Sequence, residues 1–102
     1  MKSQHQIHEM RSMRFHLIVV EHYRLAPDHV IKFGLENLNR WQQSGVECDD
    51  FKIWEQILRL TPQRLPEILS SSGEEAVRLR QSSPFAGLIP EESRQMILAT
   101  SQ

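Results

Sequence analysis

The clearest pattern of hydrophobic and polar positions lies between Pro27 and Gln43. On a helical wheel one arc holds the apolar residues and a glycine: Val30, Ile31, Gly34, Leu35, Leu38 and Trp41. Pro27 suits the first position of a helix, where its missing N–H leaves no hydrogen bond unmade, and Gly45 suits a left-handed C-terminal cap. The pattern therefore predicts an amphipathic helix over 27–43. Because Gly34 is unfavourable inside a helix, its place in the apolar arc predicts the close approach of another helix.

A second helix is predicted from Asp50 to Leu60. Asp49 and Asp50 offer a cap and a negative charge at its start, and Pro62 ends it by restricting the residue before it. The apolar residues cover about half of the helix circumference: Phe51, Ile53, Trp54, Ile57, Leu58 and Leu60. A face this broad predicts packing against two neighbours.

Shorter helical segments are predicted towards the C-terminus. Ser71 and Ser72 each precede a glutamate by three residues, a capping-box spacing that predicts a helix over 73–81. A proline followed by two glutamates predicts another helix over 90–98. Between them, residues 82–89 are apolar but too rich in helix-breaking residues to be helical.

The segment 15–20 is ambiguous. Its apolar residues point in every direction on a helical wheel, as in a central helix, but its run of β-branched residues equally suits a strand. A lone strand must pair outside its own chain, so the strand alternative predicts dimerisation through this segment. The residues expected to mediate self-association are Phe15, Leu17, Ile18, Val19 and Val20.

Length and composition are consistent with one domain. The chain has 102 residues, of which 39% are hydrophobic and 25% charged, close to ordinary soluble usage. We predict an all-α fold, an irregular bundle of four to five short helices, with an N-terminal β-strand pairing between subunits as the alternative for the ambiguous segment. Residues 14–102 are expected to form this single helical domain. The polar composition of residues 1–13 predicts a flexible N-terminal tail.

Charge and cysteine content restrict the function classes further. Twelve basic and thirteen acidic residues give a net charge of −1, which argues against coating nucleic acid or an anionic membrane. The apolar run 17–20 is too short for a signal peptide or a membrane span. The single cysteine cannot form an internal disulfide. These features predict a cytoplasmic protein that does not bind membranes.

No catalytic constellation is found in the sequence. His5 and His8 have a spacing that metal sites use, but no further ligands follow at a fixed distance. Cys48 lies among three carboxylates, which disfavour a reactive thiolate. Phosphate-binding glycine motifs are absent, and the paired glutamates are explained as helix-start acids. We expect no enzyme activity, cofactor or metal, and no family resemblance is specific enough to name.

The loop after the predicted helix 73–81 has two interpretations. Its apolar residues either plug the core, the commoner outcome, or form an exposed anchor rimmed by arginines, a composition that interface hot spots favour. The second interpretation predicts a non-enzymatic protein–protein interaction module, an adaptor or regulator whose partner is another protein. Its partner-binding residues would be Arg78, Arg80, Phe85, Leu88 and Ile89.

The alternative function is an antitoxin-like or nucleic-acid-linked regulator. Residues 1–32 carry five basic and three acidic residues, so any contact with DNA would come from this N-terminal part. The overall negative charge makes nucleic acid the less favoured partner.

Overall fold

The all-α prediction is confirmed in a computed structural model of the chain, which describes residues 3–89. Five α-helices and one short 3-10 turn occupy this range, and none of its residues is in a strand. The elements are α1 (Gln4–Leu25), α2 (Pro27–Gln43), α3 (Asp49–Leu60), η1 (Pro62–Arg64), α4 (Leu65–Ser70) and α5 (Glu74–Gln81). The helix expected over 90–98 lies outside the described residues.

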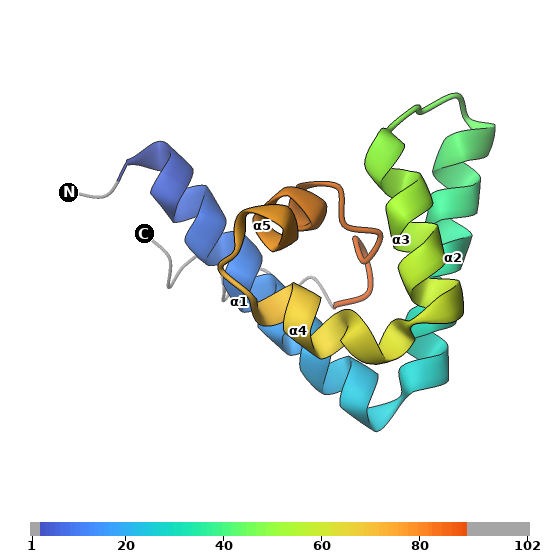
Figure 1. Cartoon of the computed structure of the whole chain (residues 1–102), viewed down its shortest axis with the longest axis horizontal. Coiled ribbons are helices and arrows are strands. Elements are labelled where there is room, and N and C mark those ends of the chain that lie inside the picture. The colour runs from blue at the N-terminus through green and yellow to red at the C-terminus, as the bar shows by residue number, and fades with distance from the viewer. Residues whose placement is uncertain (1–2, 90–102) are drawn as a thin grey trace.

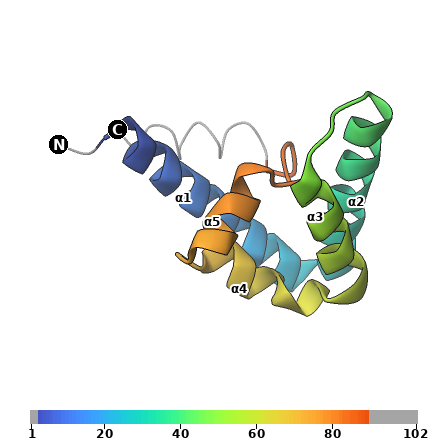
Figure 2. The ribbon, with the colours of Figure 1, turned by 45° about the horizontal axis from the view of Figure 1, so that its top comes forward.

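The longest helix, α1, organises the bundle. It contacts α2, α4 and α5, whereas α3 packs against α2. Figure 1 shows α2 and α3 side by side as an antiparallel pair at one end of the molecule, with α4 lying along α1. In the turned view of Figure 2, α5 lies over α1 and α4. The core is therefore enclosed between the α2–α3 pair and the three other helices.

The core centres on two aromatic rings from distant parts of the chain. Trp54 and Phe85 are fully buried and meet edge to face, with ring centroids 5.7 Å apart. The Trp54 indole also donates a 2.9 Å hydrogen bond to the carbonyl oxygen of Leu79. The predicted close approach at Gly34 is confirmed, because a Cβ atom there would lie 2.9 Å from Leu58 Cδ1 and 3.1 Å from Phe85 Cε1. A Cβ atom could be placed where α2, α3 and the 82–89 loop converge only if the Leu58 side chain or the Phe85 ring shifted.

The strand alternative for residues 15–20 is wrong. This segment lies in the middle of α1, whose internal hydrogen bonds satisfy its backbone without a second chain. Val19 and Val20 are buried, whereas Leu17 remains 45% exposed. The β-branched run therefore reflects burial within a helix, and dimerisation by strand pairing does not follow from it.

Residues 4–13, expected to be part of a flexible tail, form the first turns of α1. Ser3 and Gln6 make a capping box, in which Ser3 Oγ accepts from the Gln6 N–H and Gln6 Oε1 accepts from the Ser3 N–H. Farther along, the Glu9 carboxylate accepts a 3.2 Å hydrogen bond from Arg80 of α5. A local cap and one long-range ion pair thus order a segment of polar composition.

The helix ends agree only partly with the predicted caps. Gly45 follows α2 with φ of +92°, as expected for a left-handed cap. The capping box expected at Ser71 or Ser72 does not form, since α5 begins after Gly73 without a side-chain cap. Ser71 Oγ instead accepts a 3.0 Å hydrogen bond from the Gly73 N–H. Ser71 Oγ, which a capping box would need as its acceptor, is therefore used in the turn before α5.

The buried guanidinium of Arg80 joins three helices. Nη1 donates to the carbonyl oxygens of Ile68 (2.8 Å) and Ser71 (2.6 Å), and Nη2 donates to Glu9 Oε1. The two carbonyls belong to the C-terminal end of α4, where helical carbonyls lack intrahelical partners and the helix dipole favours a cation. Arg80 therefore caps α4 from α5 and holds the first half of α1 against both.

His16 is the other buried titratable residue of this region. Its Nδ1–H donates a 2.7 Å hydrogen bond to the carbonyl oxygen of Ser12, while Nε2 is buried without a hydrogen-bond partner. Protonation of Nε2 would create a positively charged imidazolium whose Nε2–H has no hydrogen-bond acceptor. Burial accordingly lowers the pKa of His16 from 6.5 to about 4, the Ser12 hydrogen bond opposes the shift, and the Arg80 charge adds to it.

The lowered pKa predicts a loss of stability in acid. Above pH 6.5 the imidazole is neutral in both states and the fold keeps its full stability. Between pH 6.5 and about 4 the unfolded chain binds a proton that the folded chain does not, so the free energy of unfolding falls by about 3 kcal/mol. Urea unfolding of the wild type and of His16→Gln across this range measures the difference. The exposed His29→Gln is the matched control, and parallel pH profiles for all three proteins would contradict the prediction.

Candidate protein-interaction groove

The structure places most of the sequence-predicted partner-binding residues in the core. Phe85 and Ile89 are 0% and 2% exposed, and Leu88 is half-buried. Arg80 is occupied in the helix junction, whereas Arg78 is exposed and forms a 3.4 Å ion pair with Asp50. The burial of Phe85 and Ile89 agrees with the interpretation of this loop as a plug of the core. The structure therefore does not offer them as an exposed anchor, and partner binding by Leu88 and Arg78 stays a prediction.

A buried asparagine holds this plug in place. Asn37 Nδ2 on α2 donates hydrogen bonds to the carbonyl oxygens of Pro84 (2.8 Å) and Ala86 (3.1 Å), one on each side of Phe85. The Asn37 side-chain oxygen accepts from Arg40 one turn later. Both N–H groups of the Asn37 amide are thus used by the two loop carbonyls. These hydrogen bonds hold the backbone on either side of Phe85 and so fix its ring in the core.

The residues expected to mediate self-association divide between the core and the surface. Val19 and Val20 are buried, and Phe15 and Ile18 are half-buried. Only Leu17 among the five is classed as exposed, at 45%. A partner that contacts this part of α1 would therefore meet Leu17 first.

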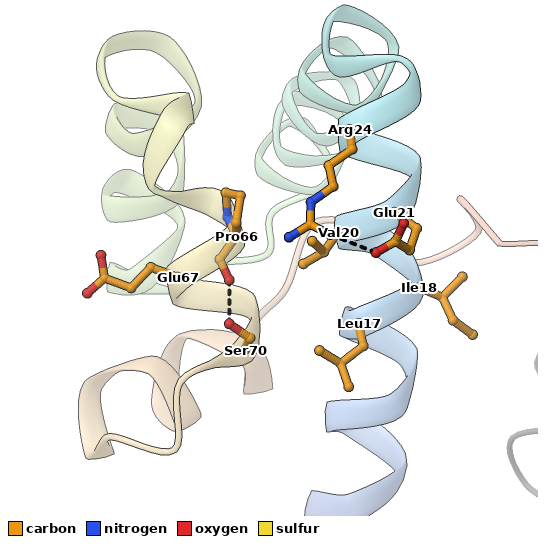
Figure 3. A pocket seen from close by; sticks show the side chains of 8 residues that line it. All are labelled: Leu17, Ile18, Val20, Glu21, Arg24, Pro66, Glu67 and Ser70. Atoms are coloured by element: carbon orange, nitrogen blue, oxygen red, sulfur yellow. Dashed lines mark hydrogen bonds and ion pairs between the residues drawn. The ribbon is translucent and has the colours of Figure 1, made fainter.

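Leu17 lines an open groove between α1 and α4 with a volume of about 650 Å³. Figure 3 shows the two helices as its walls, with Leu17 and Arg24 reaching from α1 towards α4, and Ile18 pointing to the other side of α1. The lining residues are Leu17, Ile18, Val20, Glu21, Arg24, Pro66, Glu67 and Ser70.

Helix periodicity explains the α1 wall. Leu17, Glu21 and Arg24 are spaced four and three residues apart and so lie on one face of α1. Val20, only 5% exposed, lies deeper in the same groove. This wall therefore has an apolar base and a charged upper end.

The other wall of the groove is the short helix α4, which has a proline in its first turn. Pro66 takes an early position in α4, where a missing N–H is tolerated, and Ser70 follows one turn later. Ser70 Oγ donates a 2.5 Å hydrogen bond to the carbonyl oxygen of Pro66, so its hydroxyl proton is turned back to its own helix. The wall thus presents mainly the proline ring, with exposed Glu67 beside it.

The charged groups of the groove do not converge on one point. Arg24 Nη1 and Glu21 Oε1 form a 3.0 Å ion pair along α1, and both side chains are about two-thirds exposed. Glu67 belongs to the opposite wall, and Figure 3 shows its side chain directed away from α1. General acid–base or nucleophilic catalysis needs groups held around a common reacting atom. This groove instead offers apolar side chains bordered by charges, an arrangement typical of a contact surface.

Within residues 3–89 there is no candidate metal site and no candidate membrane span. Within 3–89 no three His, Cys, Asp or Glu side chains gather where they could hold a metal ion. The side chain of His5, whose spacing from His8 is one that metal sites use, lies outside the described part. Over the same range, every helix is too short or too polar to cross a bilayer.

Comparison of the chain with family models, with curated proteins and with solved structures finds no match.

Proposed function

We propose that this chain is a protein–protein interaction module, an adaptor or regulator that binds an apolar surface of its partner in the α1–α4 groove. The observation that carries the proposal is the 45% exposure of Leu17 beside the buried Val20, in a groove whose other wall includes Pro66. Complete burial of a fully exposed leucine side chain is worth about 1.5 to 3 kcal/mol, and Leu17, 45% exposed, still has roughly half of its surface to bury, or about 1 kcal/mol. Leu17 is the most exposed apolar side chain that lines the groove, so we expect it to be the main apolar contact.

The test uses Leu17→Glu against Leu60→Glu as bait proteins in extracts of the native host. Leu60 is 75% exposed at the end of α3 and does not line the groove, so it controls for adding the same charge elsewhere. A partner should be retained by the wild type and Leu60→Glu, while its affinity for Leu17→Glu falls by about tenfold to a hundredfold.

Leu17→Glu is expected to leave the fold intact. Glutamate is a good helix former, and a substitution at an exposed helical position changes the free energy of unfolding by about 0.5 kcal/mol. Circular dichroism and urea unfolding check this for each bait. Retention of every partner by a folded Leu17→Glu protein would overturn the proposed function.

A further inference from the structure

We infer that protonation of His16 releases the first part of α1, residues 4–16, from α5, while the helices around Trp54 and Phe85 stay folded. This proton-sensitive device goes beyond the proposed function and does not depend on it. Three features carry the inference: the position of His16 at the edge of the core, the missing acceptor at its Nε2, and the positive charge of the buried Arg80 on α5.

His16 marks the point at which α1 enters the core. It is 3% exposed, and every described side chain that precedes it in α1 is exposed or half-buried. Val19 and Val20 follow it and belong to the apolar core, against which the half-buried Phe15 packs. Figures 1 and 2 show the first turns of α1 extending past α5. Release of residues 4–16 therefore withdraws none of the fully buried apolar side chains that the structure describes.

The environment of His16 accommodates only the neutral imidazole. Nδ1–H donates a 2.7 Å hydrogen bond to the Ser12 carbonyl oxygen, and Nε2 is buried without a partner. The Phe15 ring meets the imidazole edge to face, with ring centroids 5.0 Å apart. A proton added at Nε2 needs an acceptor, and water supplies one once this part of α1 has separated from α5.

The charges around His16 also oppose its protonation in the closed form. On α5, Arg80 is buried and its positive charge acts on the imidazole, whereas the other charged residues of α5 are exposed. On α4, the Glu67 side chain is directed away from α1 (Figure 3), and every titratable side chain of α2 is exposed. Glu9 lies two turns before His16 on the same face of α1, but its carboxylate is paired with Arg80. An imidazolium would therefore meet a buried cation whose own carboxylate is already engaged.

The contacts of Arg80 explain why the rest of the bundle can stay folded. Its Nη2 lies 3.2 Å from Glu9 Oε1 and holds α1, whereas its Nη1 donates to the carbonyl oxygens of Ile68 and Ser71. The Nη1 hydrogen bonds join α5 to the end of α4 and do not involve α1. When residues 4–16 separate, Arg80 keeps these bonds and gains water on the side that Glu9 leaves. The α4–α5 junction is therefore retained.

The difference in proton affinity between the two forms sets the size of the effect. Burial lowers the pKa of His16 from 6.5 to about 4 in the closed form, with the Ser12 hydrogen bond opposing the shift and the Arg80 charge adding to it. In the released form the imidazole is exposed to water and regains its ordinary pKa. The released form therefore binds a proton that the closed form does not, and its ratio to the closed form rises about thirtyfold between pH 7.5 and pH 5.

Amide hydrogen exchange of the full chain at pH 7.5 and pH 5, corrected for the intrinsic exchange rate at each pH, tests the inference. Amides of residues 8–15 should exchange through a local opening that is insensitive to low concentrations of urea, whereas amides of α2 and α3 should exchange through global unfolding, which urea promotes. The opening equilibrium of residues 8–15 should rise about thirtyfold at pH 5 in the wild type and in the control His29→Gln. In His16→Gln it should change less than about threefold.

The Glu9→Gln variant distinguishes the proton site from the contact that holds α1. It weakens the hydrogen bond to Arg80 but keeps His16, so it should raise the opening equilibrium about tenfold at both pH values and retain the thirtyfold response. The ratio between the two pH values is compared within each protein, so a uniform loss of stability in a variant does not change it. If His16→Gln does not fold, the apolar His16→Leu takes its place.

Two results would overturn the inference. In the first, the variants without His16 keep the thirtyfold response, so another group is the proton site. In the second, exchange of residues 8–15 in the wild type depends on urea as steeply as exchange in α2 and α3. The proton would then unfold the whole bundle instead of releasing the first part of α1.

Discussion

Replacing Phe85 with alanine is expected to lower the free energy of unfolding by about 3 to 5 kcal/mol. The ring is 0% exposed, meets Trp54 edge to face, and lies near Gly34 of α2. Its removal leaves a cavity where α2, α3 and the loop meet. Asn37 donates hydrogen bonds to the carbonyl oxygens of Pro84 and Ala86, on either side of Phe85. Because these bonds hold the loop backbone in place, the cavity cannot easily collapse.

Urea unfolding at neutral pH measures this effect, with Leu88→Ala as the matched control in the same loop. Leu88 is half-buried, so its truncation should cost about 1 kcal/mol. Equal losses for the two variants would contradict the view that Phe85 is the plug of the core. The result also bears on function, because loss of a partner by a Phe85 variant would reflect loss of the fold rather than loss of a surface contact.

Replacing Arg80 with alanine is expected to cost about 3 kcal/mol or more. The guanidinium is buried, and three acceptors depend on it: the carbonyl oxygens of Ile68 and Ser71, and the carboxylate of Glu9. The alanine variant leaves the C-terminal carbonyls of α4 without their donor and removes the link between α1 and α5. Such a loss is a large share of the roughly 5 to 15 kcal/mol that stabilises a domain of ordinary size.

Three further variants distinguish the roles of the Arg80 contacts. Arg78→Ala, two residues away, removes a 3.4 Å surface ion pair and should cost less than about 1 kcal/mol. Arg80→Lys keeps the charge but cannot reproduce the forked donor geometry, so it should fall between the two alanine variants. Glu9→Gln should loosen the first half of α1 and reduce amide protection there in hydrogen exchange. Equal stability of Arg78→Ala and Arg80→Ala would contradict the capping role of Arg80.

The sequence by itself determined α2, α3 and α5, because the signals that define them are local; α1, divided between an expected tail and an ambiguous segment, was not among them. The apolar arc of residues 27–43, the broad apolar face of residues 51–60 and the breaks around Pro62 and Gly73 can all be read within a few turns of one helix. Even the close approach at Gly34 could be predicted, since a glycine in an apolar face is unfavourable unless something packs there.

Only the tertiary structure decided which residues of these helices face solvent. The wheel of residues 15–20 has no polar face, so it could not show that Leu17 is exposed while Val19 and Val20 are buried. That division depends on α4, which begins 40 residues after the end of α1. The groove exists only because these two helices lie side by side, and no local pattern contains that contact. The burial of Arg80 has the same origin, since its three acceptors come from two other segments of the chain. Periodicity along one helix describes a face, but the long-range contacts of the fold determine whether that face is covered.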